Sequence, residues 1–240
     1  MTADNARAEL APTGSLRAGI NLTNTLFTRQ RADGEVEGVS VDVMRELASR
    51  LGVPLEIIVY PTPGEVADLA QDNVWDAAIL AIEQARAKTI EFSPPITGIE
   101  ATYVVHDDSP LRSIADVDRP GVRISAPEKA GYELFLTRTI QHATIVRAKS
   151  SQGSIDAFVE RRADALSGLK PSLLDAMPSL VSARMLDGTF MTVNHGIGTP
   201  RGRTVGAEYL RSFVESLNAN GFIAQSIQRH QVKGLSPVKR

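Results

Sequence analysis

The stretch WDAAILAIEQARAKTIEFSPP, residues 75–95, decides the fold class of this chain. Residues 77–82 are apolar without a break, a pattern typical of a strand that is buried on both faces of a parallel sheet. The run ends in a charged turn, and Arg86 stands just beyond it. Loops at the carboxyl ends of parallel strands are where α/β folds present groups to ligands, so Arg86 is a candidate binding residue. Its alternative role is on the surface, as a helix cap or as the partner of Glu83 or Glu91.

Strand patterns and helix patterns alternate on both sides of this stretch. Residues 16–22 and 55–60 are short β-type runs, whereas residues 40–51 carry apolar side chains at helical spacing and stop at Gly52. A long amphipathic helix ends at Gly221. This rhythm predicts an α/β protein with mainly parallel sheets. No internal repeat or low-complexity linker is visible, so two lobes would be joined by strands or tight loops.

The composition excludes several kinds of site. A formal net charge of −2 and a pI near 6.1 do not supply the clustered basic face that nucleic acid requires. The chain has no cysteine, and its four histidines lack metal-ligand spacing. We therefore expect no metal and no cofactor.

The first residues carry no apolar segment of signal-peptide length, and no apolar run is long enough to cross a membrane. We therefore expect no membrane insertion. The expected location is cytoplasmic for the chain as written, or periplasmic if a leader has been removed. Residues 1–14 are expected to form a disordered N-terminal arm.

Four phrases of the sequence, at residues 33–57, 75–95, 113–125 and 160–168, resemble a known family. The family is that of the type 2 periplasmic solute-binding proteins, most closely the polar-amino-acid-binding proteins (family 3) of ABC importers. The resemblance implies a two-lobed α/β fold with two parallel-rich sheets, in which residues 15–103 and 194–240 form lobe 1 and residues 104–193 form lobe 2. It also implies a ligand cleft between the lobes that closes by a hinge motion. For an exported protein, the partner would be an importer permease.

The resemblance also implies the site residues of lobe 1. The arginine at the position of Arg86 grips the α-carboxylate of the ligand, which suits the paired hydrogen bonds of a guanidinium fork. Asn21 and Asn24 follow the first strand at ligand-contacting positions, although ordinary turn roles remain open. Ile82 and Glu83 stand where the family has Ser or Thr donors, so an apolar wall or a carboxylate would face the ligand.

In lobe 2 the family has a strand followed by Gly-Thr, which opens a helix whose free amides bind the carboxylate. Lys129 and Ala130 occupy the Gly-Thr place, and Tyr132 either lines the cleft or packs on the lobe. Leu169 stands where amino-acid binders have the aspartate that binds the ligand's ammonium, and Lys170 follows it. Lys170 would add positive charge to the site or simply begin a helix.

These departures predict that the ligand is a small organic carboxylate, amino-acid-like but not a standard α-amino acid. An unpartnered ammonium would cost several kcal/mol if it were fully desolvated. The alternative is an enzyme on the same scaffold, a lyase resembling cyclohexadienyl dehydratase, with Glu83 and Glu128 as candidate acid or base. His195 lies near the expected return crossing and reads more simply as a hinge residue.

Overall fold

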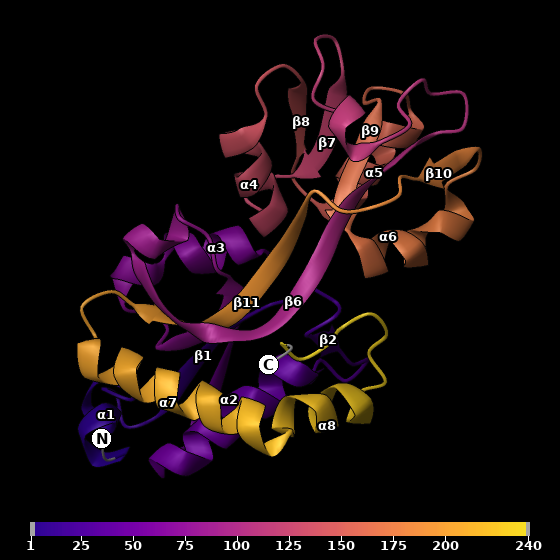
Figure 1. The fold of residues 1–240 in the computed structure, drawn as a ribbon. Coiled ribbons are helices and arrows are strands. Elements are labelled where there is room, and N and C mark those ends of the chain that lie inside the picture. Colours follow the sequence, from indigo (N-terminus) through magenta and orange to yellow (C-terminus); the bar gives the residue numbers. More distant parts are fainter. Residues whose placement is uncertain (1–2, 239–240) are drawn as a thin grey trace. The chain divides into compact units, whose positions relative to one another are not determined.

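A computed structural model describes residues 3–238 and divides the chain into two compact units (Figure 1). The first unit holds the chain up to Gly98 and from Asn194 onward, and the second holds Ile99–Val193. The crossings lie inside two long strands, β6 (Ile90–His106) and β11 (Met191–Pro200), and not in loops. The first crossing therefore falls at 98–99, compared with the expected 103–104, and the second at 193–194.

The first unit is built around the buried strand that was predicted from residues 77–82. The part of the sheet that lies in this unit has the order β4 (Leu55–Tyr60), β1 (Leu16–Asn21), β5 (Ala77–Ala81), β11 and the first residues of β6. β1 pairs with β4 and β5 in parallel, whereas β11 runs antiparallel to β5. All five residues of β5 are buried, which confirms the prediction of a buried strand in an α/β fold. Two short strands, β2 (Arg29–Gln30) and β3 (Val36–Glu37), form a separate hairpin.

Helices cover both faces of this sheet (Figure 1). One face carries α1 (Ala3–Leu10), α2 (Val39–Leu51), α7 (Thr204–Asn220) and α8 (Phe222–Arg229), and the other carries α3 (Pro63–Asp68), which packs around the buried Trp75. α2 and α7 end at Gly52 and Gly221, both in the left-handed region with φ of 65° and 76°, as their glycines predict. The N-cap of α2 is Gly38.

The predicted disordered arm over residues 1–14 is wrong where the structure describes it. Residues 3–10 form α1, and Ala6 and Leu10 are fully buried, whereas residues 1–2 lie outside the described part. The partner of this helix comes from the far end of the chain. A Cβ at Gly206 of α7 would come within 2.9 Å of Leu10, so the two helices are in close contact. Glu9 Oε2 accepts a hydrogen bond of 2.7 Å from the Gly206 amide and so caps α7.

The second unit is a five-stranded mixed sheet. Its order is β10 (Ala183–Met185), β6, β9 (Ala165–Leu169), β7 (Arg123–Pro127) and β8 (Thr144–Ala148). β6 is antiparallel to both neighbours, and β7 is parallel to β8 and β9. Three helices connect these strands: α4 (Gly131–Thr139), α5 (Ser151–Val159) and α6 (Lys170–Ala176).

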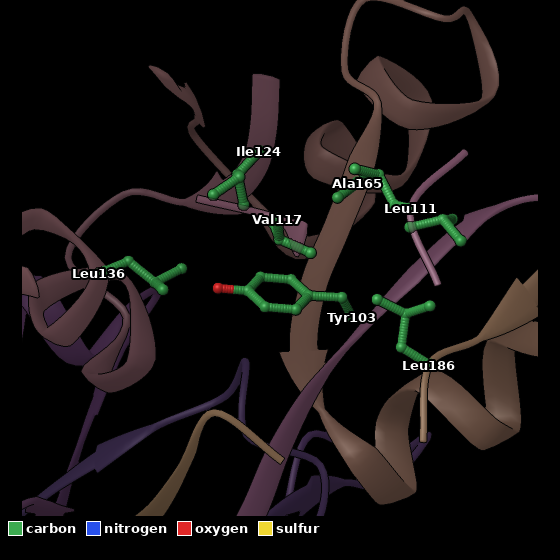
Figure 2. Close-up of a cluster of buried hydrophobic side chains, with 8 residues drawn as sticks. Tyr103, Leu111, Val117, Ile124, Leu136, Ala165 and Leu186 are labelled. Carbon is green, nitrogen blue, oxygen red and sulfur yellow. The ribbon is translucent and has the colours of Figure 1, made fainter. Parts of the chain in front are cut away.

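Alternate residues of β6 face two different cores in this unit, as strand geometry requires. Tyr103 lies in the middle of one core, where Figure 2 shows its ring among Leu111, Val117, Leu136 and other apolar side chains. Val104 faces the other core, with Phe158 and α6 residues. The second unit therefore has its own hydrophobic interior on both faces of its sheet.

In each unit, the aspartate just before a strand makes the same set of hydrogen bonds to an arginine of a neighbouring strand, which we call the clamp. In the first unit Asp76 accepts from Arg17 N (3.0 Å), Nε (2.9 Å) and Nη2 (2.8 Å). In the second unit Asp164 accepts from the same three atoms of Arg123, at 2.9, 3.0 and 2.8 Å. The backbone amide of each aspartate also donates to the carbonyl of its arginine, at 2.8 Å in both cases. This geometric repeat is not visible as a sequence repeat.

Candidate functional site

The candidate residues of the first unit meet at one edge of its sheet, where β1 and β5 end. β1 and β5 are parallel with Gly19 beside Ala78, so their carboxyl ends lie at the same edge. β11 brings His195 beside Ala81, the last residue of β5. This edge is where open α/β sheets bind ligands. We call it the β5 edge.

Arg86 begins a short helical turn (Arg86–Lys88) that follows β5, and its side chain folds back on the strand. Nη1 donates to the carbonyl oxygen of Ala81 at 3.2 Å, and only 4% of the residue is exposed. Burial lowers the pKa of the guanidinium to about 10, although the carboxylates of Glu83 and Asp68 act in the opposite direction. Arg86 is thus a buried cation at the β5 edge.

Ile82 and Glu83 connect β5 to this turn. The Ile82 amide donates to the carbonyl of Asn194 at 2.8 Å, which continues the pairing with β11. Glu83 is buried, and its carbonyl accepts from the amide of Ala87 at 2.9 Å. The structure therefore brings Ile82, Glu83 and Arg86 together at the β5 edge.

The loop after β1 adds two amides and an aromatic ring. Asn21 ends β1, and its Oδ1 accepts from the Thr23 hydroxyl at 3.4 Å. Asn24 Nδ2 lies 3.4 Å from Nε2 of His195, and the Phe27 ring lies 4.8 Å from the His195 ring at a tilt of 41°. His195 therefore belongs to the β5 edge, and not only to a strand that crosses between units. No pattern in the sequence singles out Phe27, because its packing depends on a residue 168 positions away. The sequence would place His195 beside the end of β5 only if the antiparallel pairing of β11 with β5 were known.

In the second unit the candidate residues lie at the start of α4, just after β7. Lys129 has a φ of 58°, and Ala130 is the N-cap without a side-chain cap bond. The Lys129 amide donates to Glu133 Oε2 at 3.0 Å. Glu133 is buried and also accepts from Thr137 Oγ1 at 2.6 Å and from Arg147 Nε at 2.8 Å. A carboxylate of the chain itself thus holds the turn before α4.

Tyr132 and Glu128 flank that turn. Tyr132 is the second residue of α4 and is partly buried, and burial raises the pKa of its phenol above the ordinary value of 10. Glu128 is exposed, and its amide donates to the carbonyl of Ala148 at 2.7 Å. The two carboxylates of the lyase alternative, Glu83 and Glu128, are therefore one buried and one exposed, in different units.

Leu169 and Lys170 join β9 to α6. Leu169 is the N-cap of α6 and offers no polar atom on its side chain. Lys170 Nζ lies 3.0 Å from Glu100 Oε2, both on the second unit. Because β7 and β9 are parallel, the starts of α4 and α6 lie at the same edge of the second sheet. The ion pair and the helix start account for Lys170 without a ligand.

Within residues 3–238, no group of three or more His, Asp or Glu side chains could hold a metal ion. None of the helices described is both long and apolar enough to cross a membrane.

A curated protein matches about half of this chain. A curated relative, the L-cystine-binding protein TcyJ of Escherichia coli K12, is 27% identical over 132 residues. That match covers 53% of this chain and 48% of TcyJ, so the chain spans about half the length of the curated relative that it matches.

Two solved structures share the fold. An amino acid ABC transporter substrate-binding protein from Streptococcus pneumoniae, bound to L-arginine, has a TM-score of 0.75 and 18% identity, over 99% of this chain and 100% of that one. The ancestral amino acid-binding protein AncCDT-1, a precursor of cyclohexadienyl dehydratase, has a TM-score of 0.74 and 20% identity, over 92% and 97%. At these identities the two structures show the two-lobed solute-binding fold alone.

The family itself is shown by sequence. Residues 16–232 match the profile of the bacterial extracellular solute-binding proteins, family 3. This match includes both units and every candidate residue named above. The chain belongs to the bacterial extracellular solute-binding proteins of family 3.

Proposed function

We propose that this solute-binding protein captures a small organic carboxylate through Arg86, and that the ligand is amino-acid-like but not a standard α-amino acid. The observation that carries the proposal is the buried guanidinium at the β5 edge. Cystine and L-arginine are the ligands named for TcyJ and for the streptococcal protein. The proposal keeps the carboxylate of such ligands and removes the α-ammonium.

The electrostatics of Arg86 support an anionic ligand. A fall of the pKa from 12.5 to about 10 corresponds to roughly 3 kcal/mol of free energy against the charged form. The carboxylates of Glu83 and Asp68 raise the pKa of the guanidinium, but burial lowers it more. A ligand carboxylate could offset this cost with two parallel charge-assisted hydrogen bonds. A buried cation of this kind at the ligand edge is typical of a binding group.

The second unit supports a ligand that lacks an α-ammonium group. At the end of β9 the family's aspartate is replaced by Leu169, and the next side chain, Lys170, is a cation already paired with Glu100. Neither can accept a hydrogen bond from an ammonium. The proposed roles of Lys129, Ala130 and Tyr132 in anion binding, and closure of the protein on its ligand, stay predictions.

The test compares acids that differ only in the ammonium. Isothermal titration calorimetry is performed with glutarate against L-glutamate and with 3-phenylpropionate against L-phenylalanine, and L-arginine and L-cystine are included as relatives' ligands. We expect at least one deaminated acid to bind more tightly than its amino acid. Tighter binding of every amino acid would overturn the proposal for the ligand class.

Arg86→Lys and Arg86→Ala test the role of the arginine. Truncation of one partner of a buried charge pair costs about 2 kcal/mol or more, or roughly 30-fold in affinity. The charge-conserving lysine should recover part of that loss, because it lacks only the fork. Arg45→Lys is the matched control, since Arg45 is two-thirds exposed on α2. Full affinity in Arg86→Ala would remove the arginine from the site.

The lyase alternative keeps Glu83, in the first unit, and Glu128, in the second, as its candidate acid or base. Incubation with prephenate and chromatography of the products would detect it. If the protein is exported, an ABC importer permease is the expected partner, and cell fractionation tests the location.

A further inference from the structure

We infer that residues 234–238 form a releasable strap on strand β6, and that this strap restrains the first crossing of the chain between its two units. The strap pairs with β6 at Thr97, directly before the crossing at 98–99. Because the strap involves neither Arg86 nor the ligand, it stands independently of the proposed function.

The first step is that β6 has an open edge in the first unit. Both crossings lie inside strands, but β11 has β5 on one side and β6 on the other, so its two edges are paired. The later partners of β6, which are β9 and β10, pair with residues 101–106, beyond the crossing. Before the crossing, Pro94 and Pro95 have no amide hydrogen to donate, which is typical of a strand at the edge of a sheet. This edge is therefore open to a further segment of the chain.

The second step is that the strap occupies this edge. Pro237 forms an antiparallel bridge with Thr97, and the amide of Val238 donates to the carbonyl oxygen of Ile96 at 3.3 Å. Leu235 anchors the segment, since only 5% of this residue is exposed. Proteins often cover a sheet edge with such a segment. A strand that is held at both edges bends less than a strand held at one edge, so the docked strap stiffens β6 where it leaves the first unit.

The third step is that the strap is held weakly. Lys233, Gly234 and Ser236 are exposed, and Gly234 has a φ of 77°, so a residue with wide conformational freedom begins the strap. At the bridge, Thr97 is fully buried, and its hydroxyl has no hydrogen-bond partner among the residues that the structure describes. Such a group costs free energy, which is recovered when local opening admits water. Segments with few buried contacts open in this way without unfolding of the whole domain.

Two states of the crossing follow from these contacts. With the strap docked, β6 is held at both edges up to the crossing. With the strap released, β6 stays on the first unit through β11 and through Asn218 of α7, whose Nδ2 donates to the Pro95 carbonyl at 3.3 Å, but its outer edge is free at residues 96–97. A few residues that absorb changes in backbone angles are enough for a hinge. Release of the strap should therefore widen the range of positions that the second unit takes relative to the first.

The first experiment releases the strap with Leu235→Asp, which places a charge at the buried anchor. Ser236→Asp is the matched control, because it adds the same charge at the next residue, which is exposed. The chain has no cysteine, so Ser151→Cys on α5 and Arg211→Cys on α7 place one spin label on an exposed position of each unit. Double electron–electron resonance then measures the distribution of distances between the units. We expect Leu235→Asp to broaden this distribution and Ser236→Asp to leave it unchanged.

Hydrogen exchange supplies the local readout. The amides of residues 96–100 should exchange about tenfold faster or more in Leu235→Asp, the effect of losing one hydrogen bond and the burial of one leucine. The amides of the central strand β5 should keep their exchange rates. Fluorescence of Trp75 in urea shows whether the first unit of the variant is folded.

A second variant locks the strap. Thr97→Cys with Pro237→Cys joins the two bridge partners, since antiparallel partners have Cα atoms about 4.5–5.5 Å apart, a distance that a disulfide spans. The same protein is compared oxidised and reduced, so the lock is its own control. Exchange at residues 98–102 should be about tenfold slower in the oxidised form, because local opening then requires more than the loss of one hydrogen bond. This comparison decides the matter if Leu235→Asp unfolds the first unit.

Each of three results would overturn the inference. The first is an equal distance distribution in folded Leu235→Asp and in Ser236→Asp. The second is faster exchange at residues 96–100 without a broader distribution, which would leave the segment as a cover of the sheet edge and not as a restraint on the crossing. The third is an equal exchange rate at residues 98–102 in the oxidised and the reduced forms of the locked variant.

Discussion

Replacement of Asp76 by asparagine should destabilise the first unit far more than the same change at Asp164 destabilises the second. The two aspartates make the same three bonds to an arginine, so the chemistry removed is matched. They differ in burial: the Asp76 side chain is 0% exposed and that of Asp164 is 39% exposed. Asp76 also pairs with a second arginine, Arg203, at 2.7 Å.

The magnitude follows from that difference. Asp76→Asn leaves Arg17 and Arg203, which are only 16% and 12% exposed, without their countercharge. Removal of one partner of a buried pair typically costs 3–5 kcal/mol, roughly. The exposed pair of Asp164 is screened by water, so Asp164→Asn should cost only about 1 kcal/mol. At an m-value of about 2 kcal/mol per M urea, the larger loss lowers the denaturation midpoint by roughly 2 M.

The chain supplies its own probe for this measurement. Its single tryptophan, Trp75, is fully buried in the first unit and precedes Asp76 directly. Tryptophan fluorescence in urea therefore reports the unfolding of the first unit, and hydrogen exchange of peptides from residues 99–193 reports the second. If the loss of unfolding free energy from the fluorescence of Asp76→Asn were no larger than the loss from hydrogen exchange of Asp164→Asn, the burial argument would be refuted.

Three further changes have definite expected outcomes. Gly38→Ala would place a Cβ 2.3 Å from the Phe27 carbonyl oxygen at a φ of 127°. Gly34→Ala is the control, because its φ of 86° costs about 1 kcal/mol and its Cβ would have no atom within 4 Å. The melting temperature of Gly38→Ala should therefore fall much further than that of Gly34→Ala. Glu133→Gln should cost about 1–3 kcal/mol and increase hydrogen exchange at the turn before α4, because a buried charged acceptor is lost. The hydrogen bond from Arg123 lowers the pKa of Asp164 below its value in the unfolded chain. The carboxylate therefore contributes stability above the unfolded pKa, and this contribution is lost as the pH falls through the folded pKa. In an acid titration, Asp164→Asn should lose less unfolding free energy than the wild type.

The fold was predictable where local pattern and burial agree. The apolar run before Arg86 predicts a strand that is buried on both faces, and β5 forms as predicted. Gly52 and Gly221 mark helix ends because they can adopt the left-handed conformation. These signals depend on a few neighbouring residues, which is why they can be read from the chain alone.

The features that the sequence did not predict depend on contacts between residues that are far apart in the chain. Nothing in residues 3–10 announces a helix, because the surface that buries Leu10 belongs to α7, almost 200 residues away. The pairing of Glu133 with Arg147 and that of Lys170 with Glu100 likewise depend on the finished sheet. For the site, the sequence indicated the positions at strand ends, whereas the partner of Asn24 on β11 could not be read.

The two ends of β5 carry side chains in different environments. At its start, Asp76 binds two arginines in a clamp that the second unit repeats at Asp164, so this end serves the frame that both units share. At its other end Arg86 is buried and burial lowers the pKa of its guanidinium, whereas the corresponding turn of the second unit carries a lysine at φ 58°, whose amide donates to Glu133. The starts of the strands are therefore alike in the two units, and their carboxyl ends differ. Residues Ala77–Ala81 separate the two ends by roughly 16 Å, at about 3.3 Å per residue, beyond the range at which substitutions usually couple. If Arg86 binds the ligand as proposed, we expect changes at Arg86 to alter ligand binding without loosening the clamp.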